Sequence, residues 1–113
     1  MIDTHVHLLE PDRFTYDWTK DFPALSGRFD LSDYKKASLE SGIQAAVFME
    51  VDCEESDDEA HYFCALAEQP GSFIQAVVAA ARPESPDFEQ SLEEIAHPRL
   101  TGIRRVLHTQ PDE

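Results

Sequence analysis

Short apolar runs alternate with stretches of helical periodicity along the whole chain, and this alternation limits the possible folds more than any other feature. The apolar runs span residues 2–7, 43–51, 73–80 and 102–108. Helical patterns fill the intervals at residues 31–41, 56–69 and 85–96. Strands that alternate with helices favour a parallel sheet with right-handed crossovers. The sequence therefore predicts one α/β domain over residues 1–113, with four parallel strands and three helices.

Local signals mark the ends of the predicted helices. Asp30 or Ser32 can serve as N-cap of the first helix, and Gly42 follows its last turn. Ser56 and Glu59 have the spacing of a capping box, in which each side chain bonds the backbone N–H of the other residue. The second helix carries an apolar stripe suited to packing on a sheet, formed by Ala60, Phe63, Cys64 and Ala67.

The charge balance restricts the partners of the chain. Its 9 Lys and Arg stand against 23 Asp and Glu, which gives a formal net charge of −14. Such a surface repels nucleic-acid backbones and anionic membranes, so we expect neither as a partner. The sequence also has no nucleophile elbow and no phosphate-binding glycine-rich loop, which disfavours esterase and nucleotide-binding functions.

Cysteine content and hydropathy suggest a compartment. Cys53 and Cys64 are the only cysteines, and we interpret them as free thiols in a reducing environment, with one disulfide as the alternative. The N-terminus has no basic segment followed by an apolar stretch, and no run approaches the length of a membrane span. These features predict a cytoplasmic protein.

Two histidines at the end of the first apolar run are the main candidates for chemistry. If residues 2–7 form a regular strand, the period of two places Asp3, His5 and His7 on one face. Two imidazoles on one rigid strand can bind a single metal ion. The alternative is that both histidines are simply polar residues at a strand end.

Functional groups of parallel α/β folds collect at the carboxyl ends of the strands. Glu50, Asp52 and His108 occupy such ends, and Arg104 shares a predicted strand face with His108. A guanidinium that faces the interior needs an anionic partner. Arg104 is therefore predicted either to form a structural ion pair with Glu50 or another acid, or to hold a carboxylate or oxyanion of a substrate.

The connection over residues 8–30 is long and contains several aromatic side chains. Long connections without regular structure commonly bind something or cover a site. Most of these aromatics are expected to pack the loop onto the domain. Tyr16 and Trp18, which combine an apolar body with a polar tip, are the candidates for a wall facing a substrate.

Several of these motifs together resemble the amidohydrolase superfamily, and in particular its lactonase branch. The branch includes L-fuconolactonase, L-rhamnonolactonase and 2-pyrone-4,6-dicarboxylate lactonase. The resemblance rests on Ile2-Asp3-Thr4-His5-Val6-His7, Tyr16-Asp17-Trp18, Gly102-Ile103-Arg104-Arg105-Val106-Leu107-His108 and Gln110-Pro111-Asp112-Glu113. It implies a (β/α)8 TIM-barrel type of fold, of which this chain covers about the first half. At 113 residues the chain is less than half of the roughly 250 residues of a complete barrel.

The resemblance implies a lactonase that hydrolyses a sugar lactone or a related carboxylated lactone by attack of an activated water. It makes His5 and His7 the catalytic residues and the ligands of a divalent metal, zinc above all, with Glu50 as a further candidate ligand. Relatives in this branch differ in whether they need a metal. The residues expected to bind the substrate are Tyr16, Trp18, Arg104 and His108.

Two alternatives follow from the short length. The later strands, which in this superfamily supply a further histidine and the aspartate that acts as general base, have no counterpart in these 113 residues. The chain is then a truncated, non-catalytic acidic α/β domain. In the other alternative two copies associate as a homodimer, each giving four strands, and close an eight-stranded barrel.

Overall fold

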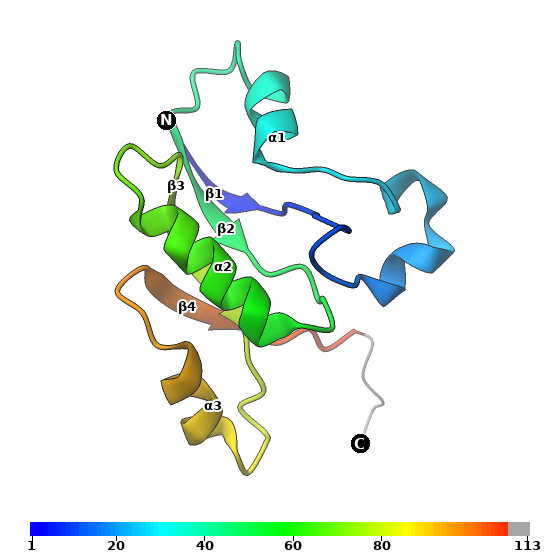
Figure 1. The fold of residues 1–113 in the computed structure, drawn as a ribbon, viewed down its shortest axis with the longest axis vertical. Coiled ribbons are helices and arrows are strands. Elements are labelled where there is room, and N and C mark those ends of the chain that lie inside the picture. Colours follow the sequence, from blue (N-terminus) through cyan, green and yellow to red (C-terminus); the bar gives the residue numbers. More distant parts are fainter. Residues whose placement is uncertain (109–113) are drawn as a thin grey trace.

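A four-stranded parallel sheet forms the centre of the molecule in the computed structural model, which describes residues 1–108 (Figure 1). The strands lie in the order of the sequence and are β1 (Ile2–Val6), β2 (Ala45–Met49), β3 (Ile74–Ala80) and β4 (Leu100–Arg104). The α-helices are α1 (Leu31–Ala37), α2 (Ser56–Glu68) and α3 (Phe88–Ile95). The predicted α/β alternation is therefore confirmed.

The two faces of the sheet differ in their cover. Along β2, Ala46 and Phe48 are fully buried, whereas Ala45, Val47 and Met49 are only half-buried. Helix α2 packs across the buried face (Figure 1). The rings of Phe48 and Phe63 stack there with centroids 3.7 Å apart. The predicted apolar stripe of α2 is confirmed, because its members Ala60, Phe63, Cys64 and Ala67 are all buried.

Strand β1 pairs with β2 in an irregular register. Asp3 lies opposite Ala46 and Val6 lies opposite Phe48, so three steps along β1 match two steps along β2. Both partners on β2 belong to the buried face, and Asp3 therefore points toward the helices together with Val6. The prediction that Asp3 shares a face with His5 and His7 is wrong, because the irregularity interrupts the period of two.

Strand β4 begins and ends earlier than the predicted run at 102–108. Leu100 begins the strand opposite Val77, and Arg104 pairs with Ala80, the last residue of β3. Because the partner strand ends there, residues after Arg104 continue outside the sheet. His108 therefore lies in an exposed turn and not on a strand face with Arg104, and the predicted Gln110-Pro111-Asp112-Glu113 motif lies outside the described residues.

The helix starts only partly follow the predicted caps. Asp30 is the N-cap of α1, and its carboxylate and that of Asp33 each accept from the other residue's backbone N–H. The predicted capping box of Ser56 and Glu59 is wrong, because Glu55 holds the N-cap position and Ser56 is already helical. Glu59 instead buries its carboxyl group under the loop that follows β2.

The connection over residues 8–30 is partly regular. It contains the 3-10 helices η1 (Asp17–Asp21) and η2 (Pro23–Leu25), and an antiparallel bridge joins Leu9 to Phe29. Cys53 and Cys64 are both buried free thiols, as expected. Within residues 1–108, no helix is long and apolar enough to cross a membrane.

Candidate active site at the carboxyl ends of the strands

The side chains of His5 and His7 meet at the end of β1. Their Nε2 atoms lie 3.0 Å apart, and the two exposed rings are nearly perpendicular. His7 Nδ1 lies 3.1 Å from the carbonyl oxygen of Met49, the last residue of β2. A carbonyl only accepts hydrogen bonds, so Nδ1 of His7 carries the proton and its Nε2 keeps a lone pair. The predicted pairing of the two imidazoles is thus present in the structure.

The charge state of His7 suits metal binding. Partial burial lowers the pKa of His7, and the nearby charge of Arg104 lowers it further, against an opposing effect of the hydrogen bond to Met49. A lowered pKa keeps the imidazole neutral near pH 7. The neutral ring is the form that binds a metal or accepts a hydrogen bond.

Asp3 connects the backbone at His5 to helix α1. Its Oδ1 accepts from the His5 amide at 3.1 Å, and its Oδ2 accepts from the hydroxyl of Tyr34 at 2.7 Å. These hydrogen bonds, with that of Tyr34 the larger influence, lower the pKa of Asp3. Burial and the neighbouring carboxylate raise the pKa of Tyr34 to about 12. Asp3 thus acts on the site through His5 and does not face it.

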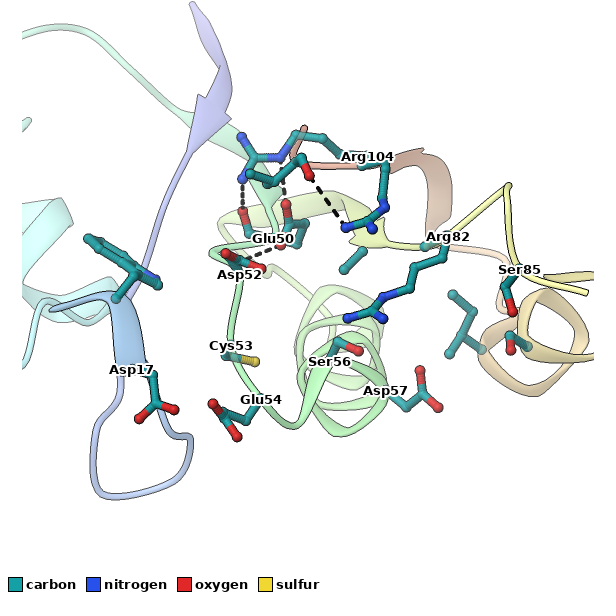
Figure 2. A pocket seen from close by; sticks show the side chains of 17 residues that line it. Asp17, Glu50, Asp52, Cys53, Glu54, Ser56, Asp57, Arg82, Ser85 and Arg104 are labelled. Atoms are coloured by element: carbon teal, nitrogen blue, oxygen red, sulfur yellow. Dashed lines mark hydrogen bonds and ion pairs between the residues drawn. The ribbon is translucent and has the colours of Figure 1, made fainter. Parts of the chain in front are cut away.

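Glu50 and Arg104 form an ion pair at the carboxyl ends of β2 and β4 (Figure 2). Arg104 Nε donates to Glu50 Oε1 at 2.6 Å, and Nη2 donates to the Glu50 carbonyl at 2.7 Å. The other carboxylate oxygen accepts from the backbone N–H of Asp52 at 2.6 Å. Both oxygens of Glu50 are therefore used inside the protein. The expectation that Glu50 is a metal ligand is not supported, and the ion-pair alternative is the one observed.

A pocket of about 440 Å³ opens beside this ion pair. It lies between the carboxyl ends of β2, β3 and β4, the first turn of α2 and one side of α3, and Figure 2 shows its polar lining. Its five acids are Asp17, Glu50, Asp52, Glu54 and Asp57, and its three arginines are Arg82, Arg104 and Arg105. The pocket lies next to the histidine pair. Met49 accepts a hydrogen bond from His7, and the following residue, Glu50, lines the pocket.

The residues predicted to bind a substrate are only partly brought together. Trp18 and Arg104 both line the pocket, and the Trp18 indole donates to the Val51 carbonyl at 2.8 Å. Tyr16 is in the hydrophobic core, and its hydroxyl accepts from the Glu10 amide. It is buried and is not among the residues that line the described pocket, so the structure does not support its predicted substrate contact. His108 is exposed in the turn after β4 and is not part of the pocket lining that the structure describes.

Two side chains near the pocket were not predicted to be site residues, although the sequence suggested other roles for both. Glu59 is 1% exposed, and burial together with the charge of Glu50 raises its pKa to about 7. Cys53 lines the pocket and contacts Glu59, and burial raises the pKa of its thiol. The capping-box spacing predicted that the carboxyl group of Glu59 bonds the backbone of Ser56 at the helix start, and it is instead buried. Its position in the first turn of a helix that follows a buried strand was the available signal.

The donor set fits part of a metal centre. Two imidazole nitrogens 3.0 Å apart suit two positions of a tetrahedral zinc site, which usually takes three or four protein ligands. Among residues 1–108 no group of three or more His, Cys, Asp and Glu side chains is arranged to hold an ion. His5 and His7 are thus the two residues of the described chain that would hold a metal.

Comparison with known proteins supports the fold. No protein-family model matches the chain, and no curated protein matches it. The solved structure of amidohydrolase 2 from Bifidobacterium longum subsp. infantis is similar to it, with a TM-score of 0.69 at 23% sequence identity. The match covers 96% of this chain and 40% of that one, so the chain spans less than half of its neighbour's length. The chain therefore has the α/β fold of part of a TIM barrel.

Proposed function

We propose that this chain is the first part of an amidohydrolase-type hydrolase, and that its reaction is the hydrolysis of a lactone. The observation that carries the proposal is the pairing of His5 and His7, with their Nε2 atoms 3.0 Å apart. The pair stands at the carboxyl end of a strand, where parallel α/β enzymes place their chemistry. The structural likeness to an amidohydrolase supports this reading of the pair.

The described residues would contribute to this reaction at two neighbouring places, the histidine pair and the pocket. His5 and His7 offer nitrogens to a divalent ion or to the carbonyl oxygen of the lactone, and the Met49 carbonyl holds His7 in the required tautomer. A bound divalent ion would polarise the carbonyl and lower the pKa of water. Arg104, fixed by Glu50, and Trp18 line the pocket that receives the rest of the substrate.

The lining of the pocket favours a neutral sugar lactone over a carboxylated one. Acids outnumber arginines around it by five to three. Without the Glu50–Arg104 pair, four acids remain in the lining against Arg82 and Arg105, and Arg105 pairs with Glu84 at 2.7 Å. Carboxylates that line a pocket accept hydrogen bonds from hydroxyl groups, but they repel a second carboxylate. We therefore expect hydroxylated, uncharged lactones to be the preferred substrates.

The proposal is tested by measuring ring opening of a panel of lactones. The panel contains neutral sugar lactones and matched lactones that carry a carboxylate, and acid release is followed with and without added Zn²⁺. We expect turnover of at least one neutral sugar lactone, and its loss when His5→Ala and His7→Ala are combined. A double variant as active as the original chain would contradict the assignment. No turnover of any lactone would favour a non-catalytic acidic α/β domain.

A second candidate concerns the half-buried face of the sheet and fits a role in assembly. Val47, Met49 and Val78 lie on this face and are partly exposed. A second copy of the chain would supply four further parallel strands, and apolar surface of this kind commonly marks an interface. Light scattering at micromolar concentration tests the homodimer. A monomeric mass at all concentrations would exclude it.

A further inference from the structure

The irregular pairing of β1 separates the roles of its polar residues. Asp3 lies opposite Ala46 on the face covered by helices, while His5 and His7, two and four residues further on, meet each other at the strand end. In a regular strand all three side chains would share one face. The histidine pair therefore depends on how the backbone between Asp3 and Val6 is held.

Asp3 is the group that holds this backbone. Its Oδ1 accepts from the His5 amide, so the residue that carries the first imidazole is tied to a side chain. Its Oδ2 accepts a short hydrogen bond of 2.7 Å from the hydroxyl of Tyr34 on α1. A carboxylate with both oxygens bound can neither rotate nor shift without losing a charge-assisted hydrogen bond.

Tyr34 is itself firmly placed. Its ring packs against the main hydrophobic core and lies edge-to-face with Phe73, with centroids 5.9 Å apart. The hydroxyl group is thus presented to Asp3 from a fixed ring. The two histidines consequently have separate anchors. The Met49 carbonyl holds the ring of His7, and the Tyr34–Asp3 pair holds the backbone amide of His5.

We propose that Tyr34 is a positioning residue for the histidine pair, acting through Asp3 on the backbone of His5. The proposal rests on the proposed function in that His5 and His7 are taken as a joint ligand pair. Loss of a group that directly orients a metal ligand commonly costs about 10- to 100-fold in affinity. Tyr34 acts one step further away, and we expect its hydroxyl to contribute about 3- to 10-fold to the affinity of the pair for Zn²⁺.

The test compares Tyr34→Phe with a matched control. Tyr34→Phe keeps the ring on Phe73 and removes only the hydroxyl. Tyr62→Phe is the control, because it also removes a tyrosine hydroxyl that bonds a carboxylate, here Glu10 at 3.4 Å. Zn²⁺ is titrated while the imidazole nitrogen signals of His5 and His7 are followed by NMR. Weaker Zn²⁺ binding in Tyr34→Phe with wild-type binding in Tyr62→Phe is the expected result.

A second readout needs no metal and separates this inference from the proposed function. Exchange of the His5 amide hydrogen and the contacts between the two imidazole rings are measured by NMR in the same variants. Asp3→Asn is added as a second substitution that weakens the hydrogen bonds from Tyr34 through Asp3 to His5. We expect faster exchange and weaker ring contacts in Tyr34→Phe and Asp3→Asn only. If the original chain binds Zn²⁺ and Tyr34→Phe shows the same Zn²⁺ affinity, the positioning role of Tyr34 is overturned and the proposed function is not affected. Failure of the original chain to bind Zn²⁺ removes the metal from the proposed function, and the exchange data then decide the role of Tyr34.

Discussion

The ion pair of Glu50 and Arg104 helps to connect the end of β2, strand β4 and the loop that follows β2. The Glu50 side chain is 1% exposed, and its oxygens join Arg104 on β4 to the amide of Asp52 in the loop after β2. Asp52 has a left-handed backbone with φ of 49°, which is uncommon for a residue other than glycine. The ion pair and the amide hydrogen bond therefore stabilise a strained loop at the wall of the pocket.

Arg104→Met is expected to destabilise the protein strongly. The change leaves a buried carboxylate without its cation, and such losses cost about 3 to 5 kcal/mol in fully buried pairs. Arg104 keeps 31% of its side chain exposed, so we expect about 2 to 3 kcal/mol by urea unfolding. Arg105→Met is the control, because its partner Glu84 is 56% exposed and the pair is worth less than about 1 kcal/mol. Equal losses in both variants would contradict this account of the ion pair.

Glu59 should make stability fall as pH rises. Its pKa is about 7 in the folded protein against 4.5 for an ordinary glutamate. Between these values the folded state holds a proton that the unfolded state has released, so raising the pH favours unfolding. The loss amounts to about 3 kcal/mol between pH 4.5 and pH 7, at about 1.4 kcal/mol per pKa unit.

Glu59→Gln removes this titration and isolates its effect. The stability of the variant relative to the original chain should increase through the window from pH 4.5 to pH 7 and then level off. Urea unfolding at several pH values measures the difference. A difference that does not change with pH would show that Glu59 does not hold its proton in the folded protein.

The candidate site was predictable where it depended on spacing along one strand. The His5-Val6-His7 spacing predicted the imidazole pair. The need of Arg104 for an anion predicted that its partner is either Glu50 or another acid of the chain, or an anionic group of a substrate. Tyr16 could not be placed, because an amphipathic ring suits a pocket wall and a core equally well, and its neighbours in the core come from distant segments. The ligand role suggested for Glu50 finds no support, because the same carboxylate is bound by Arg104.

Helix starts provide the clearest difference between sequence signal and structure. Asp30 caps α1 through a reciprocal pair of hydrogen bonds with Asp33. Ser56 lies inside α2, where Glu55 is the N-cap and makes no side-chain cap hydrogen bond. The Glu55 carboxylate instead accepts from the backbone and hydroxyl of Thr15, each at 2.7 Å. A tertiary contact has therefore replaced the local cap at α2.

Two alanine substitutions, Asp30→Ala and Ser56→Ala, test this assignment of the N-caps. Asp30→Ala should cost about 1 kcal/mol, because it leaves an amide of the first turn of α1 without its acceptor. Ser56→Ala should change the free energy of unfolding by less than about 0.5 kcal/mol, as expected for a residue without a capping role. Thermal or urea unfolding measures both. A larger loss in Ser56→Ala than in Asp30→Ala would restore the capping box predicted from the sequence.

The order and type of the elements were predictable from periodicity alone. Continuous apolar runs marked β2 and β3, and the stripe on α2 marked its buried face, because burial on a parallel sheet requires these patterns. The irregularity in β1 and the early end of β4 were not predictable. Both depend on the register against a neighbouring strand, which the sequence of a single strand does not contain.

At the scale of the whole molecule, one face of the sheet is packed under α2 (Figure 1). The side chains of β2 and β3 on the other face are half-buried. The carboxyl ends of β2, β3 and β4 surround the pocket, and the end of β1 presents the histidine pair beside it. This arrangement matches part of a TIM barrel over nearly the whole chain. We propose that His5 and His7 act as a single functional unit in that setting.

The most direct test of this claim is the rate of lactone hydrolysis in single and double histidine variants. Groups that act as one unit give strongly non-additive losses, so His5→Ala and His7→Ala should each lower kcat/KM by at least about 100-fold, with little further loss in the double variant. His61→Ala is the control, since His61 bonds Glu94 at a distance from the pair, and it should retain the original rate. Full activity in either single variant, or a loss in the double variant equal to the product of the two single losses, would contradict the account.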